Sequence, residues 1–212
     1  MSSLEVINKD NQKISIKLKG IPLQYANALR RICLNGIPVF AIDTVDIIEN
    51  SSVLPDEGLA HRLGLIPIKT DLLRFNEPSK CDCQSEAGCS NCKVMFVLDS
   101  GDSDVTRTIL SSDLTSEDES EKSTSDKIPI VQLAAGQRIK VECYARLGRG
   151  TEHAKWNSAN ISVLTETDKE NERILTIEST GALKPEQIIL AGVDELSNRL
   201  SEFKEIINQL KE

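Results

Sequence analysis

The stretch PEQIILAGVDELSNRLSEFKEIINQL, residues 185–210, decides the fold because its apolar side chains recur at alternating steps of four and three residues. This spacing places them along one stripe of a helix, as in helices that pair with other helices. Pro185 followed by Glu186 is typical of a first helical turn. Gly192 inside the helix costs about 1 kcal/mol relative to Ala, so we expect close packing there. The stripe consists of Ile189, Val193, Leu196, Leu200, Phe203, Ile207 and Leu210.

The stripe needs a surface that covers it. A helix over residues 185–210 is roughly 40 Å long at about 1.5 Å per residue. The chain offers few predicted strands for a helix of that length. One interpretation is that the helix only covers the chain's own sheet. Its length favours a second interpretation, in which part of the stripe packs internally and the rest forms an interface with another subunit.

The first forty residues are predicted to form two strands and a helix. An apolar run at 4–7 is followed by Ile14, Ile16 and Leu18, which alternate with polar residues as in a half-buried strand. Helical spacing extends over 23–35, where Asn35-Gly36 ends it. With a strand at 174–177 and the C-terminal helix, these elements predict one discontinuous α+β domain.

The middle of the chain is predicted to be a second, mainly β domain that is inserted into the first. Strands are indicated at 94–98 and 128–131, and strict alternation at 139–147 is the clearest strand signal in the sequence. Residues 111–127 are almost entirely polar, which predicts a disordered acidic loop. The alternative for this segment is an acidic arm that contacts a partner.

Four of the six cysteines lie in one short segment, Cys81-x-Cys83-x5-Cys89-x2-Cys92. Two pairs of thiolates on short turns can converge on one tetrahedral Zn²⁺ ion, and such a site is closed and structural. Redox chemistry at the C-x-x-C pair is the rival, but a thioredoxin context is absent. Ferredoxin spacing is absent as well, so we expect no iron–sulfur cluster.

The composition argues against catalysis and against strong binding of DNA by this chain. His61 and His153 are the only histidines, and neither lies in a motif typical of a nucleophile and base. The segment 148–153 lacks the third glycine and the lysine of nucleotide-binding loops, so a turn after a strand is expected. The net charge is -8 and the pI is near 5.0, which predicts little direct DNA contact. No apolar run is long enough to span a membrane and no leader is evident, so a cytoplasmic protein is expected.

Several segments together resemble the D subunits of archaeal RNA polymerases, the relatives of the third-largest subunit of eukaryotic polymerase II and of the bacterial α subunit. The motifs follow the family's order over most of the chain. They are NALRR (27–31), AID (41–43), ENSS (49–52), LAHRLGLIP (59–67), LGRGTEHAKW (147–156) and GALKPE (181–186).

The resemblance implies a non-catalytic assembly subunit of DNA-directed RNA polymerase, the nucleotidyltransferase complex of transcription. Its expected partners are the small L subunit in a heterodimer, the small N and P subunits, and the second-largest catalytic subunit. The family has a discontinuous α-like dimerisation domain, which we expect at 1–44 and 165–212. The insert domain is expected at 45–164, with the Cys-rich loop at 81–92 as the place of the family's zinc site. Some archaeal relatives carry a ferredoxin-like domain before the last strand and helix. Here residues 165–173 are a short polar link without cysteine, so that domain is not expected.

The expected partner interface combines the stripe of the C-terminal helix with Asn27, Arg30 and Arg31 of the first helix. An arginine pair on a helix could instead contact phosphate, but the acidity of the chain favours ion pairs at an interface. Two rival functions stay open. One is a free-standing zinc-binding interaction module, and the other is an α-like homodimeric scaffold.

Overall fold

The computed structural model describes residues 2–85, 88–116, 121–169 and 171–210, and the chain forms two compact units. The first unit is discontinuous and comprises Met1–Pro38 and Arg149–Glu212, and the second comprises Val39–Gly148. The α+β class is confirmed, because each unit combines helices with antiparallel strands. The units divide at 38/39 and 148/149, whereas the sequence placed the domain boundaries at 44/45 and 164/165.

The first unit contains a four-stranded antiparallel sheet in the order β1-β2-β10-β9. Ile14 and Ile16 of β2 pair with Ile177 and Leu175 of β10, so their side chains share one face, and all four are buried. This confirms the period-two pattern predicted for β2. The strands are β1 (Ser3–Lys9), β2 (Lys13–Lys19), β9 (Ala159–Glu166) and β10 (Glu172–Ser179).

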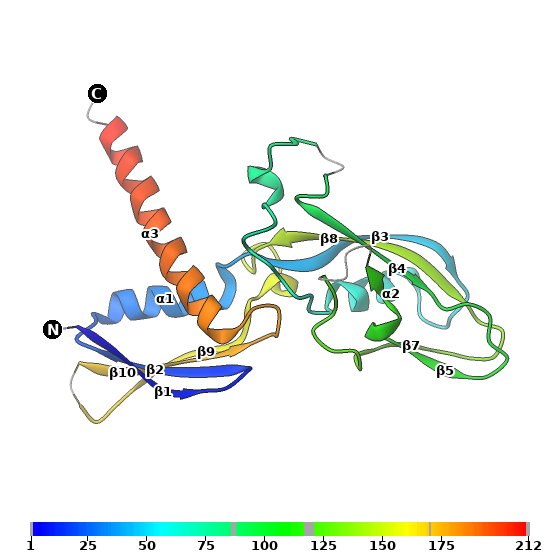
Figure 1. Cartoon of the computed structure of the whole chain (residues 1–212), viewed down its shortest axis with the longest axis horizontal. Helices are drawn as coiled ribbons and strands as arrows, with labels where there is room; N and C mark the ends of the chain where they lie inside the picture. Colours follow the sequence, from blue (N-terminus) through cyan, green and yellow to red (C-terminus); the bar gives the residue numbers. More distant parts are fainter. Residues whose placement is uncertain (1, 86–87, 117–120, 170, 211–212) are drawn as a thin grey trace. The chain divides into compact units, whose positions relative to one another are not determined.

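Two helices accompany this sheet, α1 (Leu23–Asn35) and α3 (Pro185–Gln209). Helix α1 packs against β9 and β10, and the beginning of α3 packs against β2 and β10. The remainder of α3, red in Figure 1, extends away from the sheet. Within the described part of the chain, no helix has the length and apolar character that a membrane crossing requires.

Helix α3 crosses α1 at Gly192, where the two helices approach closely. A Cβ atom at Gly192 would lie 2.9 Å from Cys33 Sγ and 3.2 Å from Leu29 Cδ1. Cys33 is fully buried, so it is surrounded by other atoms of the chain. The close contact predicted at Gly192 is therefore present, and it joins the two helices of one unit.

Gly192→Ala is expected to lower the free energy of unfolding by about 1–2 kcal/mol, because strain from overpacking outweighs the better helix propensity of Ala. Denaturant unfolding of the full chain measures this change. In the double variant Cys33→Ala/Gly192→Ala the sulfur atom is gone, so the two substitutions should be less damaging together than the sum of their separate effects. If the two changes in the free energy of unfolding simply added, the contact between Gly192 and Cys33 would be contradicted.

The second unit contains a four-stranded sheet in the order β3-β8-β4-β6 and a two-stranded sheet of β5 and β7. Helix α2 (Asp56–Gly64) packs against β3 and β7. Buried apolar residues of β3, α2, β4 and β8 form one core cluster. The strands are β3 (Val39–Asn50), β4 (Lys93–Asp99), β5 (Arg107–Leu110), β6 (Thr115–Ser116), β7 (Pro129–Leu133) and β8 (Ile139–Gly148). Short 3-10 helices cover Pro78–Lys80, Ser111–Asp113 and, in the first unit, Ala154–Trp156.

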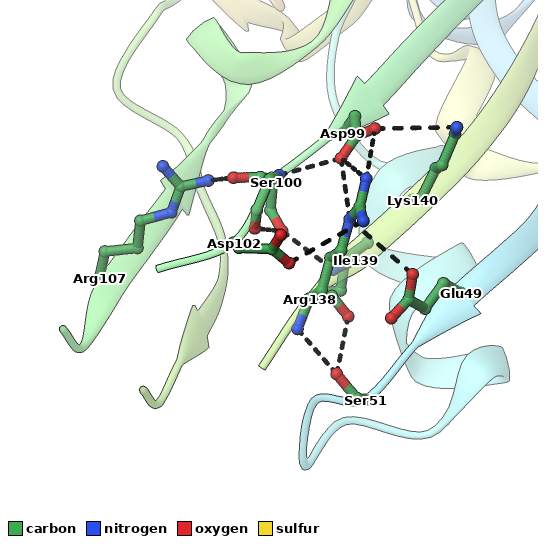
Figure 2. A network of polar contacts seen from close by, with 10 residues as sticks. Glu49, Ser51, Asp99, Ser100, Asp102, Arg107, Arg138, Ile139 and Lys140 are labelled. Carbon is green, nitrogen blue, oxygen red and sulfur yellow. Dashed lines mark hydrogen bonds and ion pairs between the residues drawn. The ribbon is translucent and has the colours of Figure 1, made fainter. Parts of the chain in front are cut away.

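Arg138, immediately before β8, joins the neighbouring strands at one end of this sheet (Figure 2). Its Nη2 atom donates to both carboxylate oxygens of Asp99, at 3.1 and 3.0 Å, and Glu49 lies 3.8 Å from its Nε atom. The backbone N–H of Arg138 donates to the Ser51 hydroxyl at 2.7 Å. These contacts connect the ends of β3, β4 and β8.

The polar segment 111–127, predicted to be a disordered acidic loop, is partly buried and hydrogen-bonded in its described parts. Ser123 is buried and forms an isolated antiparallel β-bridge with Ile68. The backbone N–H of Thr124 donates to Pro67 O at 3.0 Å, and Ser111 Oγ donates to Ser125 O at 2.5 Å. Serine hydroxyls can satisfy backbone groups locally, so a polar segment can pack without apolar side chains. Residues 117–120 of the predicted loop lie outside the described residues.

Candidate metal centre and partner interface

Two tight backbone turns bring the four cysteines of the 81–92 segment together. Gln84 N–H donates to Cys81 O at 3.3 Å, and in the second turn Lys93 N–H donates to Cys89 O at 2.9 Å. Gly88, before the second turn, has φ +79°, and a Cβ atom there would meet the Lys93 side chain at 3.1 Å. Glycine suits this position for both reasons.

The sulfur atoms have the spacing of a tetrahedral metal site. All four Sγ atoms lie within 4.8 Å of one another. The separations are 3.6 Å for Cys81 and Cys89, 3.8 Å for Cys83 and Cys92, and 3.8 Å for Cys89 and Cys92. Four sulfur ligands about 2.3 Å from a tetrahedral zinc ion would be about 3.8 Å apart. The four predicted residues are thus brought together, and they could hold a metal ion.

Two of these thiols differ in acidity. The backbone N–H of Asn91 donates to Cys89 and lowers the pKa of its thiol to about 7. Burial raises the pKa of Cys92 to about 12. The backbone N–H of Cys89 points at Cys92 Sγ from 3.2 Å, which would stabilise a thiolate there. A metal ion would therefore bind Cys89 readily and displace a proton from Cys92.

The other two cysteines have a different character. Cys33 and Cys143 are fully buried in their respective units, and burial raises the pKa of each thiol to about 12. Cys33 packs in the crossing of α1 and α3, and Cys143 belongs to the core cluster of the second unit. Both are packing residues.

The stripe predicted on α3 is largely uncovered. Val193, Leu200 and Phe203 are 49%, 53% and 61% exposed, and Leu210 is 81% exposed. Ile207 is 39% exposed, whereas Ile189 and Leu196 are half-buried. From Ser197 to Leu210 every described residue of the chain is exposed. The stripe is thus available to another protein.

The beginning of α3 packs within the chain. Its buried side is formed by Pro185, Ile188 and Gly192. Successive residues are about 100° apart around a helix, so residues 18 apart, such as Pro185 and Phe203 or Gly192 and Leu210, point to the same side. The internal contact and the stripe therefore share part of one broad apolar face, which the sequence pattern did not divide.

The predicted residues of α1 lie in two environments. Asn27 and Arg31 are exposed, whereas Arg30 is half-buried beside β9. Arg30 Nη1 donates to Ser162 O at 3.3 Å and its Nε donates to Asn27 Oδ1 at 2.9 Å. Arg30 therefore binds β9 of its own unit. A direct role of Asn27, Arg30 and Arg31 at an interface stays a prediction.

Sequence reasoning missed an apolar surface on strand β1. Leu4 and Val6 are 66% and 60% exposed, although they pair directly with the buried Leu18 and Ile16. Directly paired residues lie on the same face of a sheet, so the buried face continues into an uncovered edge. The short apolar run at 4–7 predicted a strand, and register with β2 was needed to find its exposed face.

Residues 37–180 match the family model described as RNA polymerase Rpb3/RpoA insert domain. The chain is 43% identical over 161 residues to the DNA-directed RNA polymerase subunit Rpo3 of Methanosphaera stadtmanae, which covers 74% of this chain. It is 37% identical over 191 residues to the Rpo3 of Methanocaldococcus jannaschii, covering 90% of this chain and 88% of that protein. Identity to the Rpo3 of Aeropyrum pernix is 32% over 99% of this chain.

The relatives differ in how much of their length is matched. The alignments span 58% of the Methanosphaera protein and 60% of the Rpo3 of Archaeoglobus fulgidus. The chain thus corresponds to somewhat more than half of the length of these two relatives.

Proposed function

The chain belongs to the Rpb3/RpoA family of RNA polymerase subunits, and on this premise we propose that it is a non-catalytic assembly subunit that pairs with the small L subunit. The pair would form the platform on which the N and P subunits and the second-largest catalytic subunit assemble. The observation that carries this proposal is the uncovered apolar stripe of α3.

The free part of α3 supports pairing on energetic grounds. Helices shorter than about 12–15 residues are marginal in water without tertiary contacts. The part from Ser197 to Gln209 is of this length and is exposed throughout. Burying its Leu200 and Phe203 against a partner would contribute about 1.5–3 kcal/mol for each fully buried side chain. A partner helix would therefore stabilise the element that binds it.

The uncovered edge of the sheet gives the interface a second part. Leu4 and Val6 extend the apolar face that α1 and α3 cover elsewhere in the same unit. A partner that packs on both the stripe and this edge would bury more apolar surface than a helix pair alone. Covering both parts of this surface would require a folded subunit rather than a single helix.

The four-cysteine segment would serve this function as a structural site. A zinc ion with four sulfur ligands has no open position for substrate or water. The ion would hold together the segment 81–92, in which Cys81 and Cys92 are buried. Catalysis would remain with the large subunits of the polymerase.

Co-expression of the full chain with the L subunit tests the proposal. We expect a one-to-one complex in size-exclusion chromatography with mass detection. The chain alone should be monomeric under the same conditions. A chain that stays monomeric in the presence of the L subunit would contradict the assembly role. A stable dimer of the chain alone would favour the homodimeric scaffold.

A further inference from the structure

Arg149 lies in the segment LGRGTEHAKW, whose role the proposed function leaves unexplained. Strand β8 ends at Gly148, and Glu152 N–H donates to Arg149 O at 2.8 Å, so the chain turns here. This is the turn predicted after the strand. Arg149 N–H in turn donates to Glu152 Oε1 at 3.0 Å. The turn holds the backbone of Arg149, which belongs to the first unit, and its side chain contacts other residues of that unit.

The guanidinium of Arg149 connects the two helices of that unit. Its Nη1 atom donates to the carbonyl oxygen of Gly36, the residue that caps the end of α1. The same nitrogen lies 2.8 Å from Glu195 Oε1 on α3. The Arg149 and Glu195 side chains are only 15% and 17% exposed, so water screens this ion pair less than one at the surface.

This connection is made where α3 leaves the rest of its unit. The helix contacts α1 at Gly192, and Glu195 lies on the next turn. Leu196 is half-buried, and every described residue after it is exposed. Gly192 and Glu195 thus lie just before the point beyond which every described residue of α3 is exposed, where the direction of its free half is set.

Glu195 has a second arginine partner, which does not connect α3 to α1. Arg199 Nε lies 2.7 Å from the same Oε1 atom, but Arg199 is on α3 itself and its side chain is 48% exposed. Burial raises the pKa of Glu195, and the hydrogen bonds from Arg199 and Arg149 more than offset this, leaving the pKa below its usual value. Glu195 is thus ionised at neutral pH, and of its two arginines only Arg149 links it to α1.

We propose that Arg149 is a positioning residue that fixes the direction in which the free half of α3 projects from α1, and so presents the apolar stripe to the partner subunit. The proposal deepens the function proposed above and rests on it. Arg149 itself need not touch the partner.

A positioning role has a distinct kinetic consequence. If α3 samples several directions, only the fraction with the right direction can bind, and the apparent affinity falls by that fraction. The loss then appears in the association rate, because the contacts of the finished complex are unchanged. A residue that touches the partner mainly changes the dissociation rate.

The first experiment uses the free full chain and needs no partner. Genetically encoded spin labels at Gln24 on α1 and Ser201 on α3, both exposed, report the distance between the helices by pulsed EPR. We expect a broader or shifted distance distribution in Arg149→Gln and an unchanged one in the matched control Arg199→Gln. Arg149→Lys, which keeps the charge, should be intermediate. An unchanged distribution in Arg149→Gln, or equal changes in both Gln variants, would overturn the proposal.

The second experiment measures binding of the unlabelled variants to the L subunit. We expect Arg149→Gln to lower the association rate constant about tenfold with little change in dissociation. Arg199→Gln, beside the stripe, should leave the association rate constant unchanged. A loss confined to dissociation would mean that Arg149 is a contact residue and would overturn the proposal. If the wild-type chain does not bind the L subunit at all, the proposed function fails, while the EPR comparison still decides whether Arg149 orients α3.

Discussion

Phe203→Asp is expected to abolish pairing with the L subunit while the free chain remains as stable as the wild type. Phe203 is 61% exposed in the free chain, so its replacement removes little internal packing. In the complex the new carboxylate would be buried without a partner, at a cost of about 3–5 kcal/mol. That cost lowers the affinity more than about 100-fold. Leu200→Asp, at a position that is 53% exposed, should act in the same way.

The matched control is Asn198→Asp, which adds the same charge to the same part of α3. Asn198 is exposed and lies on the side of the helix opposite the stripe. It should therefore pair normally. Size-exclusion chromatography and titration calorimetry measure pairing, and denaturant unfolding of each free variant measures stability. Normal pairing by Phe203→Asp and Leu200→Asp would show that the stripe is not the interface.

Helix α3 illustrates how far the sequence could be interpreted. Its start at Pro185 and the stripe were predictable because helical periodicity is a local property. Which face would pack internally was not, because Ile188 and Leu190 are as apolar as Ile189. The internal face includes Gly192, where a Cβ atom would lie 2.9 Å from Cys33 Sγ of α1. The glycine indicated a close contact without indicating its partner.

Strand β9 was missed for a related reason. Its buried residues include Ala159 and Ser162, while Ile161 and Val163 are 39% and 48% exposed. The alternation is therefore reversed relative to the usual apolar-inside pattern. Ser162 can be buried because its hydroxyl donates to Arg30 O at 2.7 Å. The β9 strand belongs to the sheet of the first unit, whereas the predicted boundary at 164/165 assigned it to the insert.

The candidate sites differ in how predictable they were. The four cysteines are close in sequence, so their convergence could be expected from short turns alone. The connection made by Arg149 could not, because Gly36 lies 113 residues before it and Glu195 is on another element. Leu4 and Val6 needed the register of β1 with β2 to be recognised as an uncovered face. Long-range contacts of this kind leave no periodic signal in the sequence.

The purified chain is expected to contain close to one zinc ion, and Cys83→Ser and Cys92→Ser should each reduce this to near zero. A hydroxyl is a much weaker zinc ligand than a thiolate, and loss of one ligand opens a closed four-sulfur site. Elemental analysis of the purified variants measures the metal. Cys83 is the cleaner position because it is exposed, whereas Cys92 is only 2% exposed and also contributes packing.

Cys143→Ala controls for the loss of a cysteine elsewhere in the same unit, and it should retain the zinc although its thiol is fully buried. The pH dependence provides an independent check. Zinc must displace the proton of Cys92, whose pKa is about 12, and part of that of Cys89, whose pKa is about 7. Zinc affinity, measured by competition with a chelator, should therefore fall as the pH is lowered from 8 to 6. A wild-type zinc content near zero would mean that the turns hold four unmetallated thiols, and iron in place of zinc would mean that the sulfur spacing serves a different metal.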